Sequence, residues 1–328
     1  MFSHSGSAPS PGATARVLAA TMSFVATVTL SAWSATSVSA ATLTKVPAPR
    51  TGTAYFGTYT PPTGTSWTVQ DQQNAYLSLE ASLGRTLDIT QYYYSWGDSF
   101  PTWRETWNLS SGRIPMISWG GYNTDAIANG SQDSVIRARA DAVKALAQPV
   151  FVRWLWEMDG TWTAQWVKSP SSFIAAWRHI YTVFKNRGAT NATFVWCPTA
   201  WGFQSGAAQK YYPGDAYVDW MCADGYNWAP GRPGAKWRTL SQIIQSFYTW
   251  ALPHGKPLML GEYGCQERSA GEKATWIDQA RSALKTSFPG IRAVVYFDSA
   301  TMYDWRVHTS TSAFAAFQSM ARDPYFNP

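Results

Sequence analysis

Short apolar runs alternate with longer amphipathic segments along residues 54–328, and this alternation limits the fold more than any other feature of the sequence. The apolar runs are rich in β-branched and aromatic residues, as buried parallel strands tend to be. Eight such repeats in one stretch of this length predict a single (β/α)8 barrel. The predicted strands are 54–59, 86–92, 114–119, 150–156, 193–196, 218–223, 257–261 and 291–297.

Helix signals lie between these predicted strands. Thr239 with Gln242, and Ser269 with Glu272, have the spacing of a capping box at a helix start. Glycines follow two of the periodic segments, where a helix would end. The helices predicted with readable ends cover 71–83, 132–147 (after Ser131) and 170–187.

A doubly wound sheet is the alternative arrangement for alternating strands and helices. Such a sheet usually has a glycine-rich phosphate loop after its first strand. The sequence Thr-Tyr-Thr-Pro-Pro stands there instead, at residues 58–62, which favours the barrel. No linker is visible, so we expect residues 41–53 to be a short lead and 54–328 to form one domain.

Residues 1–40 have the features of a secretory signal peptide. Arg16 is the only charged residue before Lys45, and a mostly apolar run follows it. Val-Ser-Ala at 38–40 is a small-residue cleavage site. We therefore expect cleavage after Ala40, secretion of the mature chain, and no membrane attachment afterwards.

Charge and cysteine content argue against several function classes. A formal net charge of +6 on 328 residues, with no basic run, does not indicate a nucleic-acid partner. The odd number of cysteines (Cys197, Cys222 and Cys265) leaves at least one without an intramolecular partner, and the pairing stays open. No metal-ligand spacing and no Gly-x-Ser-x-Gly elbow occurs, so we expect no metal, no cofactor and no Ser-His-Asp hydrolase.

Aromatic residues collect just after the predicted strands, where a barrel of this kind builds its active site. The chain has 19 Trp, 17 Tyr and 15 Phe, and core packing explains any single one of them well. Their recurrence at strand ends predicts a sugar-binding face, because flat rings pack against the C–H faces of sugars. The predicted sugar contacts are Trp119, Trp156, Trp162, Trp201, Tyr226 and Trp305.

Two acids stand at predicted strand ends, Glu157 after the fourth and Glu262 after the seventh. Each follows an apolar run, where an ionised carboxylate is costly to bury. Two carboxyls about 5–5.5 Å apart hydrolyse glycosides by double displacement, one as acid and base and the other as nucleophile. The structural alternative is an ion pair with Arg153 or Arg306. The rival acids are Asp159, Asp224, Asp298 and Asp304.

The run from Arg153 to Gly160, Arg-Trp-Leu-Trp-Glu-Met-Asp-Gly, resembles the fourth-strand signature of glycoside hydrolase family 26. The resemblance covers roughly residues 54–310 and implies a (β/α)8 barrel, retention of anomeric configuration and secreted β-mannanase activity. It maps the proton donor onto Glu157 and the nucleophile onto Glu262. The aromatic residues that it maps are Tyr226, as a contact of the nucleophile, and Trp162 and Trp305, as sugar contacts. The other segments that carry it are 114–119, 127–133, 212–220, 224–227, 256–264 and 304–306.

The sequence departs from the family around the acid. The family commonly has His-Glu-Met-Asn-Gly, whereas Trp156 and Asp159 stand in place of the histidine and the asparagine here. A negative charge on Asp159 is expected to raise the proton affinity of Glu157. These changes leave the substrate open, with β-1,4-mannan first and mixed-linkage β-glucan or β-1,3-xylan as alternatives.

We therefore expect a secreted, monomeric, retaining endo-β-glycosidase whose partner is a polysaccharide. A non-catalytic carbohydrate-binding barrel is a competing interpretation, and it would need neither glutamate. A transglycosylase is another, and it would use the same two acids with a sugar as acceptor.

Overall fold

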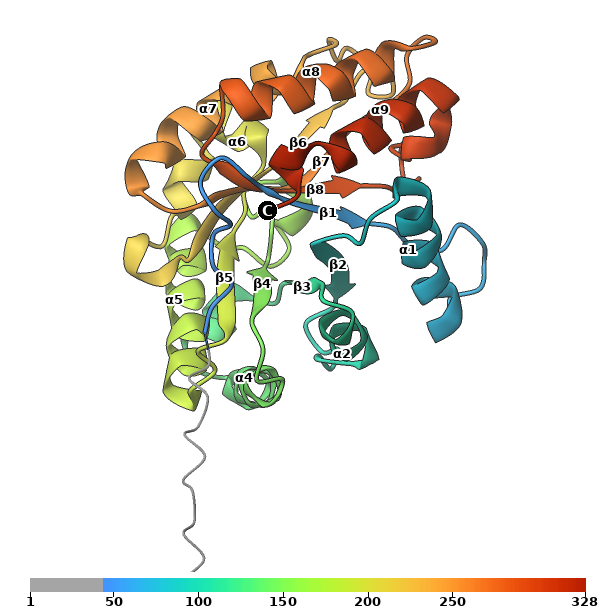
Figure 1. Cartoon of the computed structure of the whole chain (residues 1–328). Helices are drawn as coiled ribbons and strands as arrows, with labels where there is room; N and C mark the ends of the chain where they lie inside the picture. The colour runs from blue at the N-terminus through green and yellow to red at the C-terminus, as the bar shows by residue number, and fades with distance from the viewer. Residues whose placement is uncertain (1–43) are drawn as a thin grey trace, which may run out of the picture. The chain divides into compact units, whose positions relative to one another are not determined.

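The computed structural model describes residues 44–328, so the predicted signal peptide at 1–40 lies outside the described residues. Parallel strands form a closed barrel in sequential order, and β8 pairs with β1 (Figure 1). The predicted (β/α)8 barrel is thus confirmed. Among the described residues, no helix is long and apolar enough to cross a membrane. The strands are β1 (Tyr55–Tyr59), β2 (Ile89–Tyr94), β3 (Ile114–Trp119), β4 (Val150–Trp154), β5 (Ala192–Trp196), β6 (Trp220–Asn227), β7 (Leu258–Cys265) and β8 (Ile291–Phe297).

Helices surround the strands (Figure 1). The α-helices are α1 (Val69–Leu83), α2 (Trp103–Ser110), α3 (Thr124–Ala128), α4 (Asp133–Ala145), α5 (Pro170–Arg187), α6 (Ala200–Ser205), α7 (Leu240–Ala251), α8 (Glu272–Thr286) and α9 (Thr311–Arg322). The short 3-10 helices are η1 (Thr161–Thr163), η2 (Ala208–Tyr211), η3 (Asp215–Tyr217), η4 (Leu252–His254), η5 (Val307–Thr309) and η6 (Pro324–Phe326).

Alternate side chains of each strand belong to two separate apolar clusters. In β3, Met116 lies in the cluster that fills the barrel, while Ile117 and Trp119 lie in the cluster between strands and helices. This follows from the two-residue period of a strand, which sends neighbouring side chains to opposite faces. A strand residue can therefore reach the centre of the barrel only from an inward position.

The chain before β1 closes one end of the barrel. Residues 44–54 form no helix or strand, yet Val46 is buried with the cluster that fills the barrel. Its backbone N–H donates to the Thr193 hydroxyl over 2.7 Å, and its carbonyl accepts from Trp220 over 3.4 Å. Both partners stand near the first residues of their strands, so this segment covers the N-terminal end.

Several strand boundaries differ from the prediction. β6 continues to Asn227 and β7 to Cys265, so the residues predicted to follow these strands lie within them. β4 ends at Trp154, which places Trp156 in a loop rather than a strand. The polar residues at the ends of β6 and β7 still pair with the adjacent strand, so each of these strands is longer than its apolar run.

The helix ends confirm some predicted signals and contradict others. Thr239 caps α7 in a capping box with Gln242, and Gly84 ends α1 in the left-handed conformation. The predicted box of Ser269 with Glu272 is wrong, because α8 starts at Glu272 and Gly271 is its N-cap. The helix predicted over 132–147 is shorter, since it covers 133–145 as α4.

Candidate active site

An extra residue in β7 turns Glu262 into the barrel. The pairing of β6 with β7 shifts register at Gly261, which has no partner of its own in β6. Met259 faces the barrel interior, and strict alternation would send Tyr263 there as well. With the extra residue, Glu262 faces inward and Tyr263 packs in the outer cluster.

Only glycine fits at position 261. A Cβ atom there would lie 2.5 Å from Sγ of Cys222 and 2.9 Å from both Oδ1 of Asp224 and Sγ of Cys197. Cys197 and Cys222 form a disulfide between β5 and β6 at this point, and Cys265 is free and buried. The close contact with this disulfide therefore explains why the bulge carries no side chain.

Donors from other strands surround the carboxylate of Glu262. Tyr93 donates its hydroxyl to Oε1 over 2.7 Å, and Tyr226 donates to Oε2 over 2.6 Å. Arg153 also donates to Oε1 from Nη2. Burial and then the charge of Glu262 raise the pKa of both tyrosines well above their usual value, so both hydroxyls keep their protons. These three donors fix the orientation of the Glu262 carboxylate.

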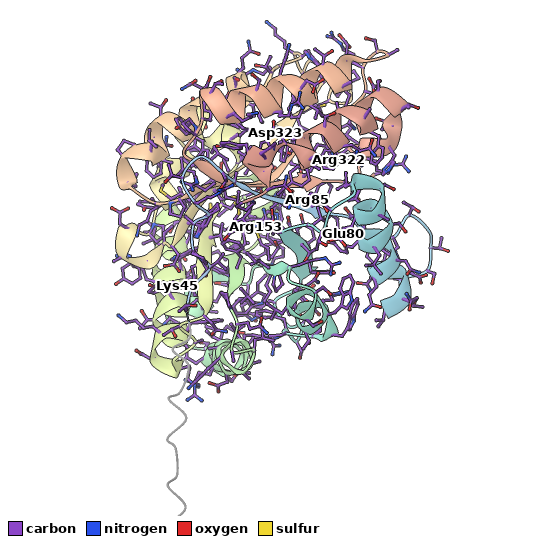
Figure 2. The ribbon with its side chains drawn as sticks, viewed as in Figure 1. Lys45, Glu80, Arg85, Arg153, Arg322 and Asp323 are labelled. Atoms are coloured by element: carbon purple, nitrogen blue, oxygen red, sulfur yellow. A yellow bond between two sulfur atoms is a disulfide. The ribbon has the colours of Figure 1, made fainter. Side chains whose placement is uncertain are left out.

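Arg153 is fully buried and lies in the middle of the molecule (Figure 2). It joins two carboxylates. Its Nη1 donates to the two oxygens of Asp224 over 3.1 and 3.0 Å, while Nε donates to Ser118 over 3.0 Å. Burial alone lowers the pKa of Arg153, but the charges of Asp224 and Glu262 outweigh it, so this pKa rises. The ion pair considered for Glu262 is thus present, and it holds the carboxylate in place.

The backbone changes direction where Glu157 leaves β4. Leu155 and Glu157 have φ angles of 42° and 53°, in the left-handed region that residues other than glycine rarely occupy. The N–H of Leu155 donates to Trp119 O over 2.9 Å, and that of Glu157 donates to Cys197 O over 2.7 Å. These contacts to β3 and β5 hold the strained turn, which carries the Glu157 side chain.

The environment of Glu157 favours its protonated form. Burial, followed by the charge of Glu262, raises the pKa of Glu157 to about 7. A hydrogen bond of 2.8 Å from Trp162 Nε1 to Oε2 of Glu157, and the charge of Arg153, oppose this rise. The two glutamates are therefore electrostatically coupled, and one favours holding a proton while the other is surrounded by donors.

Asp159 also raises the pKa of Glu157, as expected, but it is the smallest of the named causes. Its carboxylate accepts from the backbone N–H and the hydroxyl of Thr199, over 2.9 and 2.6 Å. Asp159 therefore ties the loop after β4 to the start of α6. Burial raises the pKa of Asp159 itself.

The structure brings some of the predicted sugar contacts together. Trp156, Trp162 and Tyr226 all adjoin the glutamates, and the Trp156 and Trp162 rings lie 5.3 Å apart. Trp305 is only 3% exposed and packs 4.7 Å from the Tyr226 ring, behind it. Trp201 is 68% exposed on α6.

Trp119 differs from the other predicted sugar contacts. It is fully buried and stacks on Trp96 at 4.3 Å, because its position in β3 faces the helices. The even alternation of β3 gives inward places to Met116 and Ser118 instead. A fully buried ring offers no face to a sugar, so we assign Trp119 to the packing that supports the barrel mouth.

The other rival acids have partners away from Glu262. Asp298 accepts from the N–H of Val307 over 2.8 Å, which shapes the chain after β8. Asp304 pairs with Arg306 at 2.7 Å, so Arg306 is not the partner of either glutamate.

Sequence reasoning assigned no role to several inward polar residues of the central strands, and it named Arg153 only as an ion-pair alternative. Tyr93 and Arg153 donate to Glu262, and Ser118 supports Arg153. Gln91 lies 3.3 Å from the Ser118 hydroxyl. A polar residue at alternate positions of an otherwise apolar strand is the signal that would have identified them.

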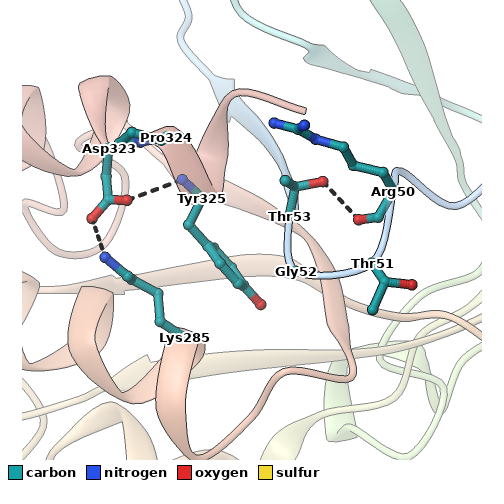
Figure 3. A pocket seen from close by; sticks show the side chains of 8 residues that line it. All are labelled: Arg50, Thr51, Gly52, Thr53, Lys285, Asp323, Pro324 and Tyr325. Carbon is teal, nitrogen blue, oxygen red and sulfur yellow. Dashed lines mark hydrogen bonds and ion pairs between the residues drawn. The ribbon is translucent and has the colours of Figure 1, made fainter.

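Two cavities lie away from the glutamates. One of about 410 Å3 is lined by Arg50, Lys285, Asp323 and Tyr325, at the end of the barrel where β1 begins (Figure 3). The other, of about 530 Å3, lies between α1 and the segment after β8 and includes Asp298. Neither cavity is lined by Glu157 or Glu262.

One group in the described part of the chain has metal-ligand spacing. The ligand atoms of Cys197, Cys222 and Asp224 lie within 4.8 Å of one another. The two sulfurs form a disulfide and Arg153 binds the carboxylate, so these donors are already engaged. The arrangement does not fit a resident metal ion.

Comparisons with known proteins point to glycosidases. A family model described as glycosyl hydrolase family 26 matches residues 121–257, a range that contains Glu157 and ends before Glu262. Endoglucanase H of Acetivibrio thermocellus is 32% identical over 272 residues, covering 79% of this chain and 30% of that protein. Beta-1,3-xylanase TXYA of a Vibrio species is 29% identical over 178 residues, covering 52% and 35%. The chain spans about a third of the length of these curated relatives.

Solved structures show the same fold. A GH26 β-mannanase from Bacteroides ovatus superposes with a TM-score of 0.59 at 15% identity, covering 84% of this chain and 90% of that one. A ruminal GH26 endo-β-1,4-mannanase gives a TM-score of 0.60 at 14% identity, with 84% and 64% covered.

Proposed function

Because the chain belongs to glycosyl hydrolase family 26, we propose that it is a retaining endo-β-glycosidase with Glu262 as nucleophile and Glu157 as acid and base. One observation carries the proposal: a carboxylate held by Tyr93, Tyr226 and Arg153 lies beside a second carboxyl whose pKa is raised to about 7. Double displacement uses such a pair, with one carboxyl as proton donor and the other as nucleophile.

The first step forms a covalent glycosyl-enzyme. A carboxylate oxygen of Glu262 attacks the anomeric carbon while the bond from this carbon to the leaving oxygen breaks. Glu157 gives its proton to that oxygen, so the leaving saccharide departs as an alcohol. Glu157 is then ionised.

The second step releases the glycone. Glu157 takes a proton from a water molecule, whose oxygen attacks the anomeric carbon and breaks its bond to Glu262. Two inversions give net retention, and both carboxyls return to their first protonation states. A sugar hydroxyl in place of the water would give transglycosylation with the same residues.

The donors around Glu262 have separate tasks. Arg153 and Tyr93 hold Oε1, which orients the carboxylate for attack. Tyr226 holds Oε2 and packs against Trp305, so Trp305 positions the tyrosine from behind. Trp156, over Arg153, offers an apolar face for the sugar that is attacked.

We propose a β-glucan as the substrate. The relative named as an endoglucanase is 32% identical over 79% of this chain, and this supports a glucan over the mannan expected from the family resemblance. Trp156 in place of the usual histidine also fits a change from mannan. β-1,4-Mannan is the second candidate, and β-1,3-xylan the third, since a β-1,3-xylanase matches about half of the chain.

We also propose that the chain is exported after cleavage following Ala40 and acts as a monomer. A mature protein that begins at Ala41, found by mass spectrometry of culture medium, would support export. A retained residue 1–40 segment would contradict it. Sedimentation of the mature protein tests the monomer.

Product analysis on a panel of polysaccharides tests the function. The panel contains mixed-linkage β-glucan, glucomannan, galactomannan, β-1,3-xylan and β-1,4-xylan, each with the wild type and with Glu262→Ala. We expect gluco-oligosaccharides from β-glucan with the wild type alone. If manno-oligosaccharides or xylo-oligosaccharides form instead, the assigned substrate changes to mannan or xylan, and the proposed mechanism stands. Tight binding of one glycan by both proteins without cleavage would favour the carbohydrate-binding barrel.

A further inference from the structure

We propose that Trp201, in the first turn of α6, binds the part of the polysaccharide that leaves on cleavage. The inference rests on the proposed function, because a leaving saccharide exists only if the chain cleaves a glycan. It goes further by placing α6 on the side of the leaving saccharide relative to the two glutamates.

Direct contacts fix the first turn of α6 against the loop that carries Glu157. The Glu157 N–H donates to the carbonyl of Cys197, at the end of β5, over 2.7 Å. Two residues later Thr199, the N-cap of α6, donates to Asp159 from both its N–H and its hydroxyl. At Gly202 a Cβ atom would lie 1.7 Å from Oδ2 of Asp159, so helix and loop are in contact here. Trp201, between Thr199 and Gly202, therefore belongs to the helical turn that contacts the loop of the acid.

The chemistry of the first step tells which side of the bond this is. Glu262 occupies the centre of the barrel, with donors from β2, β4 and β6 around it. Glu157 protonates the oxygen of the departing sugar, so this sugar lies beyond Glu157, on the side away from Glu262. The connection from β5 to α6 contacts the loop of Glu157 through the carbonyl of Cys197 and through Thr199, and on its other side it meets β6 at Asp224.

The Trp201 side chain is free to contact a sugar. Its neighbours Ala200, Gly202 and Phe203 are buried and anchor the helix, whereas Trp201 is 68% exposed. Single exposed aromatic residues are common, so exposure alone does not indicate a site. Here an exposed indole adjoins the loop of the acid, on which Trp162 is 39% exposed as well. The exposed indoles of Trp162 and Trp201 suit successive pyranose rings of a polysaccharide, because the C–H faces of such rings pack on flat aromatic rings.

A comparison of two substrates tests this inference. The polysaccharide that the wild type cleaves has sugars on both sides of the bond, whereas a 4-nitrophenyl trisaccharide of the same sugar has only a phenol on the leaving side. We expect Trp201→Ala to lower kcat/KM on the polysaccharide about three- to tenfold and to leave the nitrophenyl substrate unchanged. Trp201→Phe keeps a ring and should recover most of the loss. Leu252→Ala, which removes another exposed apolar side chain far along the sequence in η4, should change neither substrate.

The position of cleavage gives a second readout. In a hexasaccharide labelled at its reducing end, weaker binding on the leaving side shifts the cut toward that end. Unchanged polysaccharide kinetics and an unchanged cut in Trp201→Ala would overturn the inference. An equal loss on both substrates would also overturn it, because the residue would then act through Glu157. A wild type that cleaves no glycan in the panel would instead refute the proposed function.

Discussion

Trp162 donates its indole N–H to Oε2 of Glu157 over 2.8 Å, and this bond stabilises the ionised form of the carboxyl. Burial and the charge of Glu262 act in the other direction and are stronger, so the pKa of Glu157 still rises to about 7. The protein thus sets the proton affinity of its candidate acid by a balance of opposed contacts.

The first prediction is a basic limb near neutral pH. Since Glu157 must carry a proton for the first step, kcat/KM should fall as the pH rises through about 7. Trp162→Phe removes the hydrogen bond that lowers this pKa, so its limb should move to higher pH. Asp159→Asn removes a charge that raises the pKa, so its limb should move to lower pH by a smaller amount. Profiles measured on one polysaccharide check this, and limbs that coincide with the wild type would contradict it.

The second prediction separates the two carboxyls. Glu262→Ala removes the attacking oxygen, and turnover should fall by about four orders of magnitude or more on every substrate. Glu157→Ala should slow polysaccharide cleavage by about 10²–10⁴-fold, and should slow the first step with a 4-nitrophenyl glycoside far less, since that leaving group needs little protonation. Burst kinetics isolate that step, and unfolding curves check the fold. Equal losses in the first step on both substrates would count against the acid assignment.

The third prediction concerns Gly261. Its substitution by alanine places a Cβ 2.5 Å from Cys222 Sγ, so the Gly261→Ala protein should be destabilised by about 1–3 kcal/mol and lose activity. Gly97 has nothing within 4 Å of an added Cβ, so Gly97→Ala is the matched control. Its stability should change by about 0.5 kcal/mol or less. Urea unfolding measures both, and equal stability of the two variants would refute the packing argument.

The fourth prediction counts thiols. The Cys197–Cys222 disulfide leaves Cys265 as the free cysteine, buried in the fold. One thiol per chain should react after unfolding without reductant, and three should react after reduction. The bond closes a loop with a sequence separation of 25, so its reduction should lower the stability by about 3 kcal/mol. Three reactive thiols before reduction would show that the bond is absent.

The barrel could be predicted because its signal repeats along the whole domain. β3 and β8 have the predicted bounds, since isolated apolar runs define them on both sides. β6 and β7 extend further than predicted, because their last residues are polar or glycine and look like loop. Here, pairing with the neighbouring strands outweighs the low strand propensity of the single residues.

The two acids of the candidate site could be predicted from the sequence, but most of the residues that contact them could not. Glu157 and Glu262 follow apolar runs, which marked them in the sequence. The sequence does not reveal that Arg153 joins Asp224 to Glu262, because this contact spans 109 positions and depends on the register of three strands. Trp119 shows the opposite limit, since a strand-end aromatic residue faces the helices when its position is outward.

The bulge at Gly261 makes strand length a constraint on evolution and on protein engineering. A strand that lacked Gly261 could pair regularly and still turn Glu262 inward. A strand that kept Gly261 but paired without the bulge would contain every amino acid that the chemistry needs, yet it would exchange the faces of Glu262 and Tyr263. A carboxylate would then be pressed among apolar helices, and a phenol would stand where the nucleophile belongs. When a homologous strand is grafted into this barrel, its inward-facing residues must therefore be aligned with those of β7 first. Sequence identity is compared only after that.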